Sequence, residues 1–324
     1  MGWWEDLSGA VSDAVDTAAG VVQAVVDAAG DAVTDFVETG GNAAADGLNA
    51  VGVPWLGGVL AGITNLAGAT IKAGFAIVSG IVGGLIRIVG GLLTLNGNLI
   101  LKGLIDIGSG IAGALIVIAG TLLSLIQRLF FLQSNDRALT KQEKDMLRRV
   151  LYNSLALYNI RLIEGWSGAF GINDRAFTLA NTIYLKGNDP AVRPDVLVHE
   201  CVHVWQYQNI GSRYTMDALG AQAIYGDAAY DWEAELTRGN SDWNDFNKEA
   251  QAQLIQDIWR WGSLTFNGHT TDGDGCFYDL EDVQSRFDNG TAEFIFRGTG
   301  YTDLATQAIK SLRGSINLRW SRSF

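Results

Sequence analysis

A long apolar stretch, residues 56–132, constrains the fold of this 324-residue chain more than any other feature. Almost all of its residues are Ile, Leu, Val, Ala or Gly. Large apolar side chains recur at alternating steps of four and three, the spacing of one helical stripe: Ile71, Phe75, Val78, Val82, Leu85, Val89 and Leu92. Gly83, Gly90 and Gly97 recur every seven residues, and small residues on one stripe let helices approach closely. The stretch therefore predicts long, closely packed helices.

A reversal of the chain is expected in the middle of this stretch. Asn96-Gly97 is its strongest turn dipeptide. Folding about this turn gives a glycine-rich apolar helical hairpin over residues 51–133. Arg87 lies ten residues before Gly97 and Asp106 nine after it, so the two charges would meet and neutralise each other. A β-hairpin about the same turn is the alternative, because Gly and Ile are poor or middling helix formers.

The same hairpin is a candidate for membrane insertion. Residues 107–126 are twenty residues without a charge, the length that crosses a bilayer core. Residues 73–101 are interrupted by Arg87, which is costly at mid-bilayer unless it is paired. We expect residues 51–133 to contact a membrane. The alternative is a soluble bundle, or a surface that packs against further copies of the chain or against a secretion particle.

Residues 1–50 are strongly acidic, with nine Asp or Glu and no Lys or Arg. Apolar residues again recur at steps of four and three: Val11, Val15, Ala18, Val22, Val25, Ala29, Ala32 and Phe36. The aspartates mostly lie away from this stripe. The pattern predicts an acidic amphipathic helix that packs its apolar stripe on the rest of the chain. Anionic lipid would repel the polar face, which disfavours a helix lying on a membrane surface.

Charge and cysteine content exclude some classes of protein. The net charge of −12 argues against a nucleic-acid partner, because phosphate binding needs a basic surface. Cys201 and Cys276 do not make a disulfide framework, which fits synthesis in a reducing compartment. Acids follow Met1 almost at once, so no secretory signal peptide is expected. We therefore expect a protein made in the cytoplasm that is membrane-associated or exported by a specialised system.

The second half of the chain contains His199-Glu200-Cys201-Val202-His203 in a predicted helix. Residues four apart share one helical face, so His199 and His203 can point at one metal ion. Glu200 is adjacent, where a carboxylate can serve as general base toward water. Two surface histidines on an ordinary helix are the alternative. Short β-rich segments precede the helix, which is the order of a zincin or of any small α+β domain.

A catalytic zinc site usually needs a third protein ligand. His269 lies in a polar, glycine-rich loop and is disfavoured. Glu233 and Glu235 lie among other acids, as on a solvated face. Glu249 lies beside the apolar stripe of a predicted helix, which suits a ligand that points inward. Glu249 is therefore favoured, and the Glu233/Glu235 pair is the alternative.

Residues 197–208, Leu-Val-His-Glu-Cys-Val-His-Val-Trp-Gln-Tyr-Gln, resemble the metal helix of bacterial zincin-like H-E-x-x-H metallopeptidase domains of the Rhs- or Vgr-associated type. The resemblance extends to residues 177–184 and 246–252 and covers about residues 139–258. It implies Zn²⁺, a peptide or protein substrate, and Glu249 as the third ligand. It also suggests that the strand around residues 183–185 aligns the peptide.

The chain departs from that family at Gln253, where glutamate zincins commonly have an acid that orients a histidine ligand. Asp257 is a candidate to replace that acid. No residue is an unambiguous donor to the transition state. Tyr225 and Tyr230 are both candidates, and Tyr230 is preferred.

These patterns predict four regions. Residues 1–50 form an acidic amphipathic helix and residues 51–133 an apolar helical hairpin, which together make an all-α, glycine-rich N-terminal region. Residues 134–262 form an α+β zincin-like domain in which short strands precede the metal helix, opening with a capping box from Thr140 to Glu143. Residues 263–324 are a C-terminal extension.

The function expected from these regions is a zinc-dependent metallopeptidase fused to a membrane-interacting module. The resemblance implies a secreted or injected bacterial effector or toxin, delivered for example by a contractile injection system. The alternative is a structural or assembly protein, part of a bundle, filament or delivery particle, whose zincin-like domain binds metal without catalysis.

Overall fold

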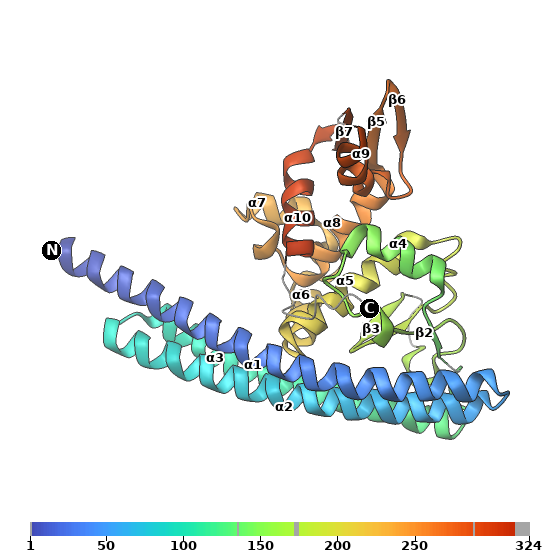
Figure 1. Cartoon of the computed structure of the whole chain (residues 1–324). Helices are drawn as coiled ribbons and strands as arrows, with labels where there is room; N and C mark the ends of the chain where they lie inside the picture. Colours follow the sequence, from blue (N-terminus) through green and yellow to red (C-terminus); the bar gives the residue numbers. More distant parts are fainter. Residues whose placement is uncertain (1, 135, 172–174, 288, 315–324) are drawn as a thin grey trace. The chain divides into compact units, whose positions relative to one another are not determined.

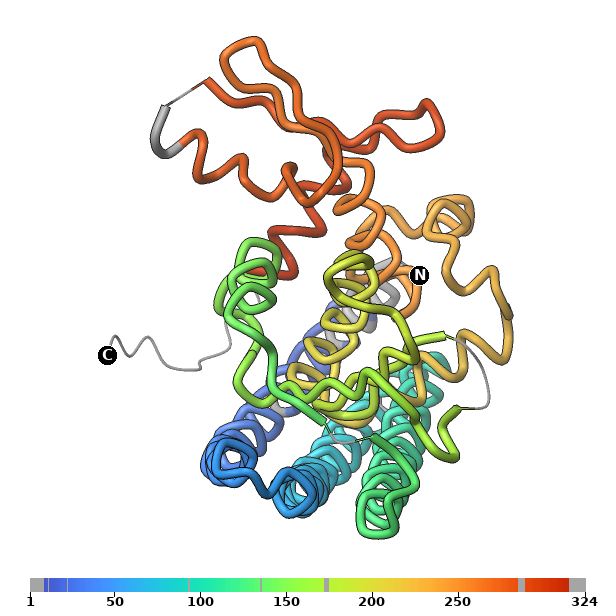
Figure 2. Tube along the Cα trace, turned by 90° about the vertical axis from the view of Figure 1, so that its right-hand side faces the viewer, coloured from blue at the N-terminus to red at the C-terminus, as the bar shows by residue number. Residues whose placement is uncertain are grey.

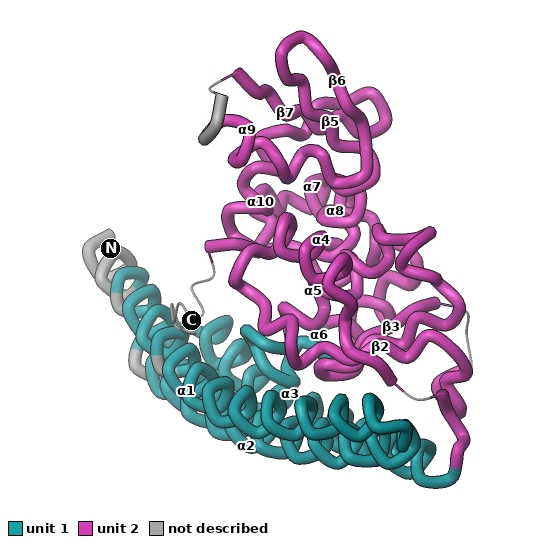
Figure 3. The backbone as a smooth tube through the Cα atoms, turned by 45° about the vertical axis from the view of Figure 1, so that its right-hand side comes forward, with its two compact units in different colours: residues 1–130, 207–217 teal, residues 131–206, 218–324 magenta. Residues whose placement is uncertain are grey.

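The computed structural model describes residues 2–134, 136–171, 175–287 and 289–314. The chain is mostly helical with two small sheets, which fits a general α+β layout. It divides into two compact units (Figure 3). Unit 1 comprises residues 1–130 and 207–217, and unit 2 comprises residues 131–206 and 218–324.

Unit 1 is built on three long helices, α1 (Gly2–Ala50), α2 (Pro54–Thr94) and α3 (Gly97–Leu129), which run alongside one another (Figure 1). Leu95 ends α2 in the left-handed conformation. Asn96 then caps α3, because its side chain accepts a hydrogen bond from the backbone N–H of Leu99 at 3.2 Å. The reversal predicted at Asn96-Gly97 is confirmed, and the β-hairpin alternative is wrong.

The three helices form a single layer. Figure 2 views them nearly end-on, with α2 (cyan) between α1 (blue) and α3 (blue-green). Glycines bring α2 and α3 together backbone to backbone. A Cβ added at Gly84 would lie 2.5 Å from the Gly103 carbonyl oxygen, and one at Gly80 would lie 2.8 Å from that of Asp106. A side chain larger than that of glycine does not fit at these two positions.

The helices of unit 1 bury polar side chains and expose large apolar ones. The buried polar or charged residues are Ser12, Gln23, Asp31, Thr34, Glu38, Asn42, Thr64, Asn65, Lys72, Ser79, Arg87, Thr94, Asp106, Thr121, Ser124, Gln127 and Arg128. Members of the predicted apolar stripes point outward instead, with Val25 65% exposed and Phe36 83% exposed. The prediction that α1 packs its apolar stripe on the rest of the chain is therefore wrong. The narrow seams between helices hold small and polar groups, and a single layer encloses no apolar core.

Buried cations explain why α1 turns its acidic side inward. Lys72 of α2 forms an ion pair with Asp31 of α1 and donates to the backbone carbonyl of Gln208 at 2.8 Å. Arg87 pairs with Asp106, as the hairpin predicted, and also with Asp16. Lys72 and Arg87 are thus each neutralised by acids of neighbouring helices, which offsets the cost of burying them.

Two helices of unit 1 are long and apolar enough to cross a membrane. The candidate spans are Pro54–Leu92 and Gly97–Leu129, with mean hydropathies of 2.0 and 2.2. In the part of the chain that the structure describes, these two helices meet the criterion by length and composition alone.

Unit 2 begins with a four-stranded sheet in the order β1-β2-β4-β3. Its strands are β1 (Arg137–Ala138), β2 (Arg161–Ile163), β3 (Phe177–Leu179) and β4 (Thr182–Tyr184). β2 and β4 pair in parallel, and β3 pairs antiparallel with β4. Helix α4 (Lys141–Leu151) opens with the predicted capping box between Thr140 and Glu143. Helix α5 (Pro194–Ile210) follows the sheet and carries the histidine motif.

The remainder of unit 2 is more helical and ends in a second sheet. The helices are α6 (Arg213–Tyr225), which belongs to unit 2 from residue 218 onward, α7 (Trp232–Thr237), α8 (Lys248–Trp261), α9 (Leu280–Phe287) and α10 (Thr302–Gly314). The strands β5 (Gly262–Phe266), β6 (His269–Asp272), β7 (Gly290–Phe296) and β8 (Thr299–Gly300) lie in the order β6-β5-β7-β8. One buried apolar cluster includes Leu147, Val198, Leu254, Phe294 and Leu312. The second sheet and α10 therefore share a core with the motif helix.

Candidate metal centre

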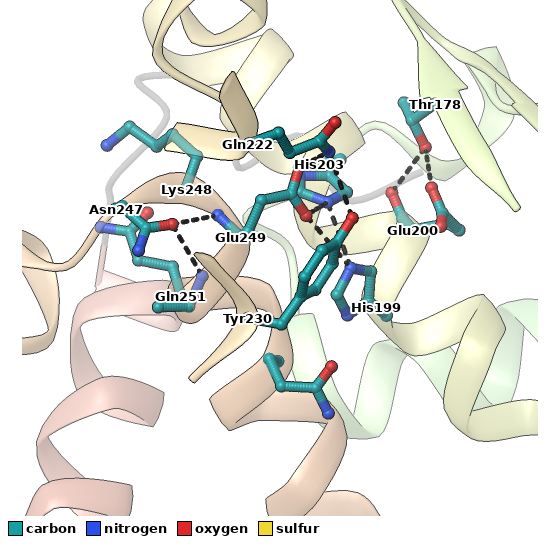
Figure 4. Close-up of polar contacts among 12 residues, drawn as sticks. Thr178, His199, Glu200, His203, Gln222, Tyr230, Asn247, Lys248, Glu249 and Gln251 are labelled. Carbon is teal, nitrogen blue, oxygen red and sulfur yellow. Dashed lines mark hydrogen bonds and ion pairs between the residues drawn. The ribbon is translucent and has the colours of Figure 1, made fainter. Parts of the chain in front are cut away.

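Helices α5 and α8 bring three predicted ligands together inside unit 2 (Figure 4). The Nε2 atoms of His199 and His203, one turn apart on α5, lie 3.2 Å from each other. Oε2 of Glu249 on α8 lies 3.2 Å from Nε2 of His203 and 3.7 Å from Nε2 of His199. All three side chains are buried. The group could hold a metal ion.

The spacing of these atoms can be compared with a tetrahedral ion. Zinc binds nitrogen and oxygen ligands at about 2.0–2.1 Å, which places two ligand atoms of a tetrahedron about 3.3 Å apart. The separations of 3.2, 3.2 and 3.7 Å are close to that value. Two imidazoles and one carboxylate therefore fit a four-coordinate ion and leave one position for water or substrate.

The charges of the three ligands are coupled. Burial alone would lower the pKa of His203, but the charge of Glu249 and its hydrogen bond raise that pKa to about 9. Burial would raise the pKa of Glu249, yet the two histidines hold it well below its usual range. Without a metal, the pair is an imidazolium and a carboxylate. A metal ion must therefore displace the proton on His203.

An amide orients His203. Its Nδ1 lies 2.8 Å from Oε1 of Gln206, three residues along α5. The amide nitrogen of Gln206 donates to the carbonyl of Lys248 and to Oε1 of Gln251, each at 3.0 Å. Gln206 thus does for His203 what was predicted for Asp257. Asp257 instead accepts hydrogen bonds from Trp232 and Gln253.

Glu249 is held from two directions. Asn247 caps α8 by accepting from the backbone N–H of Glu249 at 3.0 Å, which fixes the start of the helix. Gln222 donates to Oε1 of Glu249 at 2.7 Å, so Oε2 is left facing the histidines. Glu235, a rejected candidate ligand, accepts from the side chain of Asn247 at 2.6 Å and steadies the cap.

Glu200 lies buried beside the first sheet. The hydroxyl of Thr178 on β3 donates to Oε2 of Glu200 at 2.8 Å. Figure 4 shows Glu200 on the Thr178 side of the two imidazoles, away from Glu249. Sequence reasoning missed Thr178 and Gln222, because only the fold brings them to the motif. Gln206 could have been predicted from the sequence, because a residue three positions after His203 lies on the same face of the helix.

Tyr230 packs against the group. Its ring lies 6.0 Å from the ring of His199, centroid to centroid, at an interplanar angle of 26°. Burial and the charge of Glu249 raise the pKa of Tyr230 to about 12, so the phenol keeps its proton at neutral pH. The guanidinium carbon of Arg175 lies 5.1 Å from the centroid of the same tyrosine ring. Tyr225, the other candidate, is 42% exposed and lies beneath Arg238.

The remaining candidates lie outside the group. His269 is exposed on β6, and Glu233 pairs with Arg297 and accepts from the hydroxyl of Tyr301. Comparisons of the chain with protein-family models, curated proteins and solved structures return no match. The metal centre therefore stands on its geometry.

Proposed function

We propose that unit 2 is a zinc-dependent peptidase domain of the zincin-like kind. The observation that supports this most directly is the near-tetrahedral spacing of His199, His203 and Glu249, with Glu200 adjacent in the same helix. Zinc is the metal that such a donor set commonly takes, although the donor set alone does not select it.

The chain's own residues supply the acid–base steps. Zinc, when bound, acidifies water and polarises a substrate carbonyl. The carboxylate of Glu200 would take a proton from the attacking water and return it to the leaving amine. The phenol of Tyr230, protonated because its pKa is about 12, donates a hydrogen bond to the oxyanion of the transition state. Thr178 holds the carboxylate of Glu200 between these events.

The sheet offers an edge that could align an extended peptide. The strand suggested for this role, β4, pairs with β2 on one side and β3 on the other. Among the described residues β3 pairs with β4 alone, so the outer edge of β3, like that of β1 at the other end of the sheet, can accept an extended peptide. The alignment is therefore assigned to β3, the strand that also carries Thr178.

Glu200→Gln is the decisive variant for catalysis. We expect it to bind zinc as the unmodified chain does and to lose peptide cleavage, because an amide cannot accept the proton from water. Glu233→Gln, the same change at a glutamate outside the group, should keep both properties. Zinc content by elemental mass spectrometry and cleavage of a peptide library are the two measurements. A zinc-loaded chain that cleaves no peptide would remove the peptidase part.

We also propose that unit 1 places its apolar faces against lipid, which would make the chain a membrane-acting effector. The polar seam and the apolar exterior support this, because charged groups in membrane bundles face inward and pair. Flotation of the full chain with lipid vesicles tests it.

One observation favours the assembly alternative. The 41 residues of α2 and 33 of α3 extend about 62 and 50 Å at 1.5 Å per residue, well beyond a hydrocarbon core of about 30 Å. Further copies of the chain could cover the apolar faces of these helices along their whole length, whereas a bilayer core would cover only part of it. Sedimentation of the chain without lipid then shows a discrete oligomer, and vesicles leave its size unchanged.

A further inference from the structure

Unit 2 contains a cavity of about 640 Å³ near the metal group. It is formed by the segment before α7, by one face of α8 and by strand β7. Its volume lies within the roughly 300–1,000 Å³ of ordinary ligand sites. Of its lining residues, Tyr230 alone takes part in the acid–base steps proposed above.

Helix α8 leads from the metal group into the cavity. Glu249, Gln253 and Asp257 are spaced by four residues, and the amide of Gln253 donates to Asp257 at 2.9 Å, so they follow one face. Gln253 and Asp257 line the cavity, which therefore begins about one turn, 5.4 Å, from a metal ligand.

Tyr230 connects the two sites. Its ring stacks on His199 and also lines the cavity. A peptide whose carbonyl lies at the metal group would pass this ring, and one of its neighbouring side chains would reach the cavity.

The charged groups of the cavity are largely occupied by one another or by neighbours. Arg297 pairs with Glu233 at 2.9 Å, and Asp227 pairs with Arg175 at 2.8 Å. Asp257 accepts from the indole of Trp232 at 2.9 Å. These carboxylates and guanidinium groups hold partners already, so a charged ligand would have to compete for them.

The apolar part of the lining is open. Trp261 at the end of α8 is 54% exposed and Ile295 of β7 is 55% exposed, and Phe296 lines the cavity beside it. Large exposed apolar side chains around a concave site are typical of ligand pockets. Their burial by an apolar group would drive binding.

We propose that this cavity binds a bulky apolar side chain, aromatic or branched aliphatic, of the peptide that is cleaved at the metal group. The proposal rests on the peptidase function proposed above. It assigns a role to the C-terminal extension: β7, which lies outside the resemblance to zincin-like domains, supplies one wall of the specificity pocket.

The test measures binding separately from cleavage. The zinc-loaded full chain carrying Glu200→Gln is titrated with two blocked peptides, Gly-Gly-Phe-Gly-Gly and Gly-Gly-Asp-Gly-Gly, by calorimetry. We expect at least tenfold tighter binding of the phenylalanine peptide. Adding Ile295→Lys should abolish that preference, whereas Val192→Lys, the same change at an exposed valine elsewhere in unit 2, should keep it.

Trp261→Gln is a second variant, used if Ile295→Lys lowers the zinc content or the melting temperature. Equal binding of the two peptides, or a preference that survives both pocket variants, overturns the cavity proposal. Cleavage of both peptides by the unmodified chain at equal rates overturns it while the peptidase stands. A preference that Ile295→Lys removes, in a chain that cleaves nothing, supports the cavity and removes the peptidase.

Discussion

The two units bury opposite kinds of side chain. Unit 2 has a large apolar cluster, and the charged groups buried within it include the three that meet at the candidate metal centre. Unit 1 buries a polar seam and turns Leu, Ile, Val and Phe outward. In unit 2 three buried ionisable groups meet at one point where they could hold a metal ion, whereas the buried Arg161–Asp136 pair is part of the packing. In unit 1 the buried charges are part of how the helices pack, and the signal of function is the exposed surface.

Magnitudes support this distinction. Leaving a Leu, Ile, Val or Phe side chain in water costs about 1.5–3 kcal/mol relative to burying it. Unit 1 exposes many of these, including Leu85, Val89 and Leu92 on α2 and Leu104, Ile105 and Leu115 on α3. A bilayer or further copies of the chain would recover that free energy. Unit 2 holds a large apolar cluster in its interior, and its exposed apolar side chains include Trp261 and Ile295 at the cavity.

The largest predicted effect lies in the polar seam. Arg87→Met removes a buried cation from Asp106 and Asp16, which keep Arg213 and Lys102 as partners. Breaking a buried ion pair from one side costs about 3–5 kcal/mol, and the remaining partners place the expected loss at or below the lower end of that range. Lys141→Met also replaces a cation by methionine, but at an exposed i,i+4 pair of unit 2, and should change the free energy of unfolding by less than about 0.5 kcal/mol. Chemical unfolding of the full chain measures both. Equal effects would mean that the seam is not what holds unit 1 together.

Sequence patterns were most reliable where they are local. The turn at Asn96-Gly97, the pairing of Arg87 with Asp106 and the capping box at Thr140 all depend on residues close in sequence or related by one reversal. Glu249 is likewise distinguished from the other acids by a local feature, its place beside the apolar stripe of one helix. These features need no knowledge of the rest of the fold.

Patterns were less reliable where a neighbouring element decides. The apolar stripe of α1 has the spacing of a core face, yet the cations of α2 draw Asp31 and Asp16 inward and leave Phe36 outside. Hydrophobic periodicity gives the face of a helix, but it does not say whether water, lipid or protein lies against that face. Thr178 and Gln222 have no sequence signature because distant segments bring them to Glu200 and Glu249.

A second, smaller effect is expected at the metal centre. Gln206→Leu removes the acceptor for Nδ1 of His203, and loss of such an outer partner typically weakens metal binding 10–100-fold. Gln256→Leu is the matched control, a buried glutamine on α8 that donates to Asp195 instead. Zinc affinity is measured by competition with a chelator. If both variants bind zinc equally well, the amide of Gln206 does not position His203, and the contrast between the buried polar groups of the two units is weaker than stated above.

The smallest predicted effect is a pH dependence of unit 2 between pH 6.5 and 9, at most about 1.4 kcal/mol per pH unit for one proton. The pKa of His203 is raised to about 9 in the metal-free fold, so its stabilisation is complete below its ordinary pKa of about 6.5 and is lost as pH rises through 9. The pKa of Glu249 is lowered, so its stabilisation is present above about pH 4.5 and is lost in acid.

Zinc displaces the His203 proton, so the rise in melting temperature on adding zinc should grow from pH 6.5 to 9 while the metal-free protein weakens. Glu249→Gln should flatten the metal-free profile over that range, because the carboxylate that raises the pKa of His203 is gone. If the stability of metal-free Glu249→Gln still falls with pH as before, the titrating group lies elsewhere. His203 and Glu249 would then not be coupled as one site.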